Sequence, residues 1–113
     1  MTPKVSIILA NYNEEKYIAE AIESVINQTY TNWELIIIDD ASTDRSQDII
    51  NSYKDSRIKT RFCKKNNHVA YASNLGIDMA IGEYIAKIDS DDVWEAKKLE
   101  KQVLFMEEHT EYG

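Results

Sequence analysis

Short apolar runs of strand length recur along the chain. Val5–Leu9, Leu35–Ile38 and Tyr84–Ile88 are mostly apolar, and a weaker strand is expected over Arg57–Cys63. The apolar residues in these runs do not alternate strictly with polar ones. Such strands are typical of a parallel sheet that is covered on both faces.

Segments with a helical period lie between these runs. Between Glu14 and Gln28 the apolar positions follow the spacing of one helix face: Ile18, Ala21, Ile22, Val25 and Ile26. Ser42 is the expected N-cap of a second helix. A third helix is expected around Ala72–Ala80 with Gly82 closing it, and a fourth over Glu95–Glu108.

Alternating strands and helices predict an α/β fold, a doubly wound and mainly parallel sheet with helices on both faces. The 113 residues contain only three Gly and one Pro, so no flexible linker divides them and a single domain is expected. Ligands of such sheets bind outside the carboxyl ends of the strands.

Composition excludes several classes of protein. A formal net charge of −7 disfavours a nucleic-acid-binding protein, which would need a basic face. Cys63 is the one cysteine, so no internal disulfide can form. No run approaches the roughly 18 apolar residues that span a bilayer, so no membrane span is expected in this chain.

Acidic and amide side chains gather where three predicted strands end. The first strand leads into Asn11-Tyr12-Asn13-Glu14, the second into Asp39-Asp40, and the fourth into Asp89-Ser90-Asp91-Asp92. Carboxylates about 5 Å apart repel by roughly 3 kcal/mol per pair at an effective dielectric constant near 20. A divalent cation such as Mg²⁺ or Mn²⁺ relieves this repulsion, and it needs only one or two carboxylates when a diphosphate completes its shell.

These acids also allow other interpretations. Asp44 and Asp92 are equally suited to cap the helices that follow them. A calcium-binding EF-hand loop beginning at Asp89 fails, because Trp94 stands where its tight turn requires Gly. Neither glycine-rich phosphate-binding motif is present. A phosphoryl-accepting signalling domain would need an acidic pair after the first strand, where Asn11 and Asn13 stand.

Two segments carry a resemblance to a family: VSIILANYNEEKYIAEAIESVINQTYTNWELIIIDDASTD and NLGIDMAIGEYIAKIDSDDVWEAKKLEKQ. They resemble the N-terminal half of the family 2 glycosyltransferases, enzymes with the GT-A, nucleotide-diphospho-sugar transferase fold. The resemblance implies that residues 1–113 form the N-terminal, donor-binding part of such an enzyme. The implied reaction is transfer of a sugar, with inversion, from a nucleotide-diphosphate sugar (a UDP-sugar is expected) to a hydroxyl of a carbohydrate or lipid-linked acceptor.

The same resemblance assigns roles to particular residues. The nucleotide would be lined by Ala10, Tyr12, Glu14, Asp39, Asp40 and Asp89. Asp89-Ser90-Asp91 would be the D-x-D signature, with Asp91 the first metal ligand and Asp89 the second, for Mn²⁺ or Mg²⁺. The general base for the acceptor hydroxyl is expected beyond Gly113, so the chain alone is expected to bind the donor without transferring sugar.

Departures from the family's usual pattern keep a second hypothesis open. Ala10 stands where the family usually has Pro, His68 where Gly is common, and Ser73 where an Arg often contacts the diphosphate. The alternative is a non-catalytic module that binds a nucleotide sugar or a divalent metal, or a degenerate transferase used as a scaffold.

The resemblance also carries expectations about location and assembly. Such enzymes often build surface polysaccharides, which implies a cytoplasmic protein, at the cytoplasmic face of the inner membrane in its full-length form. A sheet edge left exposed by truncation would favour a homodimer.

Overall fold

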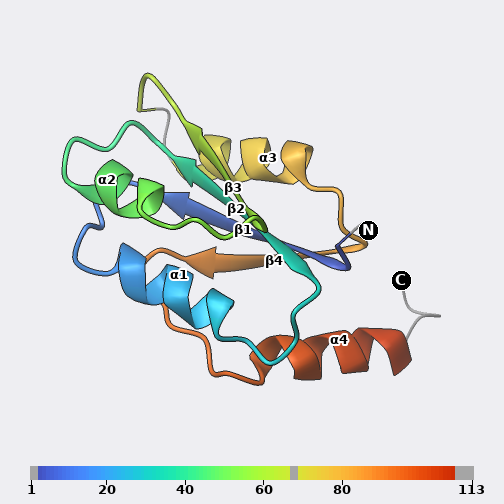
Figure 1. Ribbon diagram of the computed structural model, residues 1–113. Helices are drawn as coiled ribbons and strands as arrows, with labels where there is room; N and C mark the ends of the chain where they lie inside the picture. Colours follow the sequence, from blue (N-terminus) through green and yellow to red (C-terminus); the bar gives the residue numbers. More distant parts are fainter. Residues whose placement is uncertain (1–2, 67–68, 109–113) are drawn as a thin grey trace.

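The computed structural model describes residues 3–66 and 69–108. Strands and helices alternate along these residues in the order β1 (Val5–Asn11), α1 (Ile18–Ile26), β2 (Trp33–Asp39), α2 (Ser46–Asn51), β3 (Ile58–Phe62), α3 (Val69–Met79), β4 (Tyr84–Asp89) and α4 (Lys98–Glu108). All strand pairs are parallel, and the sheet order is β3-β2-β1-β4 (Figure 1). The predicted α/β fold with a mainly parallel sheet is confirmed.

The register of the strands brings their carboxyl ends to one edge. Asn11 at the end of β1 pairs with Asp39 at the end of β2. On the other side of β1, Ala10 pairs with Asp89 at the end of β4. Three polar segments that are far apart in the sequence therefore emerge side by side, about 5 Å from strand to strand.

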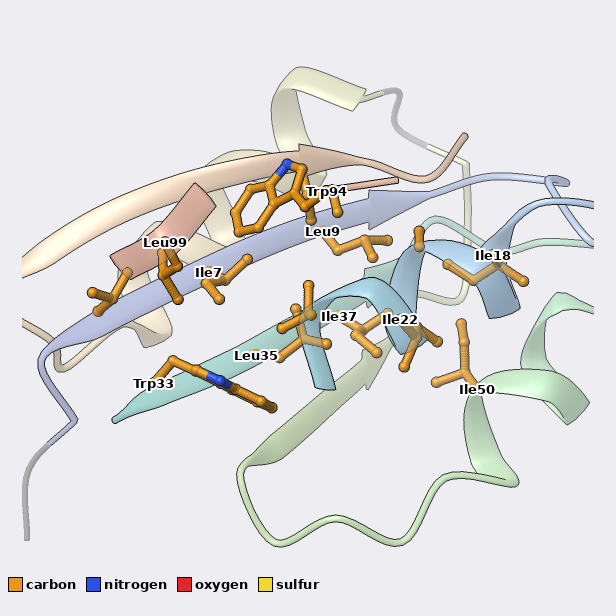
Figure 2. Packing of buried hydrophobic residues seen from close by; sticks show 14 of the residues in the cluster. Ile7, Leu9, Ile18, Ile22, Trp33, Leu35, Ile37, Ile50, Trp94 and Leu99 are labelled. Carbon is orange, nitrogen blue, oxygen red and sulfur yellow. The ribbon is translucent and has the colours of Figure 1, made fainter. Parts of the chain in front are cut away.

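The larger hydrophobic core lies on the sheet face covered by α1, α2 and α4 (Figure 2). The fully buried side chains Ile7, Leu9, Leu35 and Ile37 come from β1 and β2 and pack among those of the helices. Each such side chain contributes roughly 1.5–3 kcal/mol when it is buried. Trp33 and Trp94 are also buried in this core.

Within residues 3–66 and 69–108, α3 alone covers the opposite face, where it packs on β1 and β2. Gly76 permits this close approach, because a Cβ there would lie 2.5 Å from Cγ2 of Ile8. On the same face of β4, Ile85 and Lys87 are exposed. The sheet is thus covered on both faces at β1 and β2 but not at β4, which explains a lysine inside a strand.

Several element boundaries differ from the sequence prediction. The first helix begins at Ile18 rather than Glu14, because the carbonyl of Glu14 closes a turn by accepting from the N–H groups of Tyr17 and Ile18. The last helix begins at Lys98 rather than Glu95. The prediction of Ser42 as an N-cap is wrong: the second helix begins at Ser46, and the Ser42 hydroxyl bonds to Asp39 instead.

The prediction that Gly82 closes the third helix is also wrong. The helix ends at Met79. Gly82 instead lies against β1, where its N–H donates to Oγ of Ser6 at 2.8 Å. A Cβ at Gly82 would lie 2.8 Å from the backbone nitrogen of Ser6, so close packing requires glycine here.

Among the described residues, no helix combines the length and the apolar character that crossing a bilayer requires.

Candidate functional site

The loops that follow β1 and β2 are joined by the side chain of Asn13. Its Oδ1 accepts from the backbone N–H groups of Thr43 and Asp44, at 2.8 and 3.2 Å. Its own N–H donates to Oγ of Ser42 at 2.9 Å. Asn13 and Ala41 have left-handed backbone conformations, with φ of 52° and 64°. Ala41 lacks the side-chain hydrogen bonds that make this conformation tolerable for Asn, so local strain lies at this edge of the sheet.

Asp39 is the centre of this pair of loops. It is fully buried, and its carboxylate accepts from Nδ2 of Asn11, Nε2 of Gln47 and both the N–H and the hydroxyl of Ser42, all at 2.7–2.9 Å. Both oxygens are therefore satisfied inside the chain. Asp39 shapes the loop from within and presents no surface to a ligand.

Asp40 is also buried, and its N–H donates to the carbonyl of Asn11 at 2.8 Å. This bond continues the link between the loops one residue beyond the paired strands. The Asp39-Asp40 pair therefore lies behind the rim of the site rather than on it.

Asp44 and Asp92 could each cap a helix or bind a ligand, and the contacts of the two residues differ. Oδ1 of Asp44 accepts from the N–H of Ser46, the first residue of α2, and Oδ2 accepts from the N–H of Glu15. Burial raises the pKa of Asp44, but its bonds to Ser46 and Glu15 outweigh burial and hold the pKa below its ordinary value. Asp44 thus fastens the start of α2 to the first loop. Asp92 is exposed and accepts from the N–H of Val93.

The exposed polar groups at this edge come from the ends of β1 and β4. Tyr12 is 41% exposed, Glu14 is half-buried, and Asp89 and Asp91 are exposed. The side-chain oxygen of Asn11 is buried and has no hydrogen-bond partner among the described residues. Buried acceptors are normally satisfied, so this oxygen is an exception just inside the carboxyl edge of the sheet.

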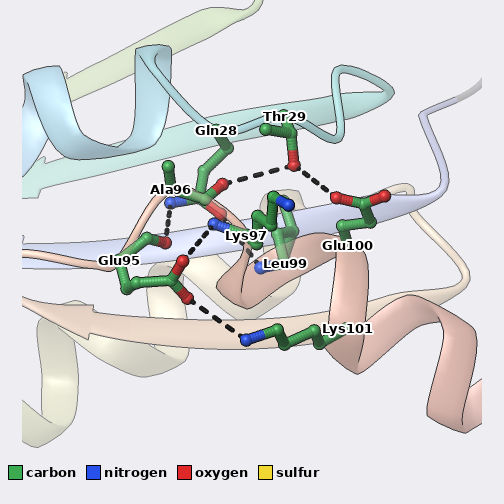
Figure 3. Close-up of polar contacts among 8 residues, drawn as sticks. All are labelled: Gln28, Thr29, Glu95, Ala96, Lys97, Leu99, Glu100 and Lys101. Atoms are coloured by element: carbon green, nitrogen blue, oxygen red, sulfur yellow. Dashed lines mark hydrogen bonds and ion pairs between the residues drawn. The ribbon is translucent and has the colours of Figure 1, made fainter.

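The segment after β4 is held against the end of α1 by Gln28 (Figure 3). Its Nε2 donates to the carbonyl of Glu95 at 2.8 Å, and its Oε1 accepts from the N–H of Leu99 at 2.9 Å. Thr29 adds a bond from its N–H to the carbonyl of Ala96 at 3.0 Å. These bonds fix the polypeptide a few residues beyond Asp91.

The acidic groups at this edge suit a divalent cation that a diphosphate helps to bind. No three acidic, histidine or cysteine side chains of the described residues are grouped closely enough to hold a metal by themselves. Asp89 and Asp91 could supply two hard oxygen ligands. Mg²⁺ and Mn²⁺ accept such a set when phosphate oxygens and water complete the shell, so the residues fit the ion.

The structure brings all seven predicted site residues to one edge of the sheet and adds two residues whose roles the sequence analysis missed. Ala10, Tyr12, Glu14, Asp39, Asp40, Asp89 and Asp91 all lie at or just beyond the carboxyl edge of the sheet. Gln28 and the bonding role of Ser42 were missed. Gln28 lies just past the end of α1, three positions after Val25 and in line with the apolar face of that helix, a signal that its polar side chain is buried. Ser73 lies half-buried on α3, and His68 lies outside the described residues.

Comparison with known sequences gives consistent matches. The profile of "Glycosyl transferase family 2" matches residues 6–113. The putative teichuronic acid biosynthesis glycosyltransferase TuaG of Bacillus subtilis is 43% identical over 110 residues, which cover 96% of this chain and 44% of that protein. The Escherichia coli UDP-Glc:alpha-D-GlcNAc-diphosphoundecaprenol beta-1,3-glucosyltransferase WfaP is 50% identical, over 91% of this chain and 41% of the relative. The chain thus spans less than half the length of these relatives.

Solved structures agree in fold. Staphylococcus aureus TarS, residues 1–349, in complex with UDP-GlcNAc superposes with a TM-score of 0.90 at 31% identity, covering 95% of this chain and 32% of that one. The mannosyltransferase PcManGT of Pyrobaculum calidifontis, in complex with GDP-Man and Mn²⁺, superposes with a TM-score of 0.84 at 26% identity, over 94% of this chain and 33% of that one.

Proposed function

This chain belongs to glycosyl transferase family 2, and we propose that its protein transfers a sugar from a UDP-sugar to the hydroxyl of a carbohydrate or lipid-linked acceptor. Residues 1–113 form the donor-binding part of the catalytic domain in this proposal. The observation that carries it is the shared edge of β1, β2 and β4, where the loop residues fixed by Asp39 lie beside the exposed Asp89 and Asp91. WfaP, whose name states a UDP-Glc donor and a lipid diphosphate acceptor, supports the choice of substrates.

The nucleoside is held at the ends of β1 and β2. In this proposal the exposed ring of Tyr12 stacks on the base, and the half-buried Glu14 accepts from a ribose hydroxyl. Ala10 lines the floor beside Asp89. In this proposal Asp40, one residue beyond the paired strands, accepts from the imide N–H of the base, and Asp39 is a positioning residue that holds this loop in shape.

Asp91 and Asp89 would hold a divalent cation at the end of β4, where the diphosphate of the donor lies in this proposal. When bound, Mn²⁺ or Mg²⁺ supplies a Lewis acid beside the diphosphate. The acceptor oxygen attacks the anomeric carbon from the side opposite the diphosphate, and the bond from that carbon to the phosphate oxygen breaks, which inverts the configuration. The general base for the acceptor hydroxyl lies beyond residue 113 in this proposal, so these residues alone bind the donor without transferring sugar.

Titration calorimetry of the chain with UDP, with and without Mn²⁺, tests the proposal. We expect binding that depends on Mn²⁺, and we expect Asp91→Asn to weaken it by at least about tenfold, the loss of roughly one charge-assisted interaction. Asp92→Asn is the matched control, since Asp92 is equally exposed and only one residue away. The proposal fails if millimolar UDP does not bind in the presence of Mn²⁺, or if both variants lose affinity equally.

A further inference from the structure

A basic hollow lies at the carboxyl end of β3, between this strand and α3. Its volume is about 420 Å³, and its lining includes Arg61, Cys63, Lys64, Lys65, Tyr71 and Leu75. Three basic residues fall within five positions of a chain whose net charge is −7. This concentration of positive charge runs against the overall balance of the protein and therefore marks a local function.

Two of these cations are not neutralised within the protein. Among the described residues, no carboxylate lies within ion-pair distance of Arg61 or Lys64. In contrast, Lys4, Arg57 and Lys59 each contact a carboxylate at 2.6–2.7 Å. Arg61 and Lys64 therefore present positive charge that an external anion can balance.

The hollow is separate from the proposed donor diphosphate site. In the order β3-β2-β1-β4 the two outer strands are three spacings apart, which places their ends about 14 Å from each other. The proposed base site at the ends of β1 and β2 lies between them. A phosphate in the hollow would thus belong to a molecule other than the donor.

We propose that this hollow binds the headgroup phosphate of an anionic membrane phospholipid. Arg61 and Lys64 supply the donors for the phosphate oxygens, and Lys65 adds positive charge beside them. Tyr71, 47% exposed on the rim, has the amphipathic ring that favours the boundary between headgroups and acyl chains. The choice of a lipid rests on the proposed function, because a transferase with a lipid-linked acceptor meets that acceptor at a membrane surface.

Vesicle co-sedimentation tests this inference with two matched triple variants. One variant carries Arg61→Gln, Lys64→Gln and Lys65→Gln; the control carries Lys54→Gln, Lys97→Gln and Lys101→Gln, exposed lysines elsewhere on the surface. Both change the net charge by the same amount. With phosphatidylcholine vesicles that contain 30% phosphatidylglycerol, we expect the first variant to lose on the order of 100-fold in affinity, since each basic residue near such a surface is worth about fivefold. We expect the control to lose less than about fivefold.

Equal losses of affinity in the two triple variants would overturn the inference. So would the absence of binding between the unmodified chain and the phosphatidylglycerol vesicles at low salt. Binding of inorganic pyrophosphate in the hollow without any binding to vesicles would overturn it as well. UDP titration with Mn²⁺ separates this inference from the proposed function. We expect the hollow variant to bind UDP as the unmodified chain does, and loss of UDP binding in that variant would place the hollow within the donor site instead.

Discussion

The two buried carboxylates of β2 lie at opposite ends of the strand and are satisfied in different ways. Glu34, near the amino end, is 2% exposed and accepts from Oγ of Ser6 at 2.5 Å, Nζ of Lys59 at 2.6 Å and the N–H of Ile81 at 2.8 Å. Asp39, at the carboxyl end, is bonded by amide, hydroxyl and backbone N–H groups. Of these two, only Glu34 has a basic side chain within ion-pair distance among the described residues.

The difference between Glu34 and Asp39 distinguishes a structural hydrogen-bond network from a ligand-binding site. The charge of Glu34 is balanced within the chain, so its network fastens the connection between α3 and β4 to the sheet and requires no ligand. Among the described residues, Asp39 has hydrogen bonds but no cationic side chain within ion-pair distance, and Asp89 and Asp91 add two exposed carboxylates at the same edge. The negative charge at this edge therefore suits an external cation.

The largest effect is expected from Glu34→Ala. The substitution leaves the hydroxyl of Ser6 and the N–H of Ile81 without their acceptor, at about 1–3 kcal/mol each, whereas the freed ammonium of Lys59 is 43% exposed and adds little, so the total is about 2–5 kcal/mol. Urea denaturation of the chain should show a loss in this range. Mn²⁺-dependent UDP affinity of the folded variant should stay within about twofold of the unmodified value, because the network lies at the opposite end of the sheet.

Glu34→Gln is the matched control, since its amide oxygen can still accept from two of the three donors. We expect about half the loss in the free energy of unfolding. A cost below about 1 kcal/mol for Glu34→Ala, or a large fall in UDP affinity, would contradict the assignment of Glu34 to a structural network.

A smaller loss of stability, joined to a loss of binding, is expected from Asp39→Asn. The new amide group must face at least one of the donors that now bond Asp39, which costs about 1–3 kcal/mol. Because the loop around Ser42 then loosens, UDP affinity should fall about tenfold. Asp48→Asn, an exposed substitution in the first turn of α2, is the control and should cost under about 0.5 kcal/mol. If Asp39→Asn lowered stability with no change in affinity, the two ends of β2 would be equivalent.

The sequence was sufficient to predict the side of the sheet on which the site lies. Apolar runs located β1, β2 and β4, a weaker pattern over Arg57–Cys63 located β3, and strand ends rich in Asp and Asn identified the carboxyl edge. Local sequence could not show that Asp39 is buried inside a loop while Asp91 is exposed, because both are aspartates in acidic clusters. Burial and donor geometry separate them, and these depend on loop conformations such as the left-handed Ala41, where local propensity predicts otherwise. Ser42 was misassigned for the same reason, since a hydroxyl that suits a helix cap can also bond a nearby carboxylate.

The smallest effect is a dependence of stability on pH that belongs to the amino end of β2. Burial raises the pKa of Glu34, but bonds from the N–H of Ile81, from Lys59 and from Ser6 outweigh burial and bring the pKa below its ordinary value of 4.5. A lowered pKa in the folded state means that the unfolded chain binds the proton more tightly. The charged network therefore stabilises the fold fully above pH 4.5, and this contribution is lost as the pH falls through the lower, folded-state pKa.

Comparison of Glu34→Gln with the unmodified chain isolates this contribution, because the variant has no carboxyl group to titrate at that position. We expect the difference in their free energies of unfolding to be constant between about pH 5.5 and 7 and to shrink as the pH falls below about 4.5, where the unfolded carboxyl group takes up its proton. The pKa of Asp55 is also lowered, chiefly by hydrogen bonds from Arg57. Its contribution to the pH dependence of stability is the same in both proteins and therefore cancels from the difference. A difference that stayed constant down to pH 3.5 would mean that Glu34 gains nothing from its charge, and the contrast between the two ends of β2 would then rest on hydrogen bonding alone.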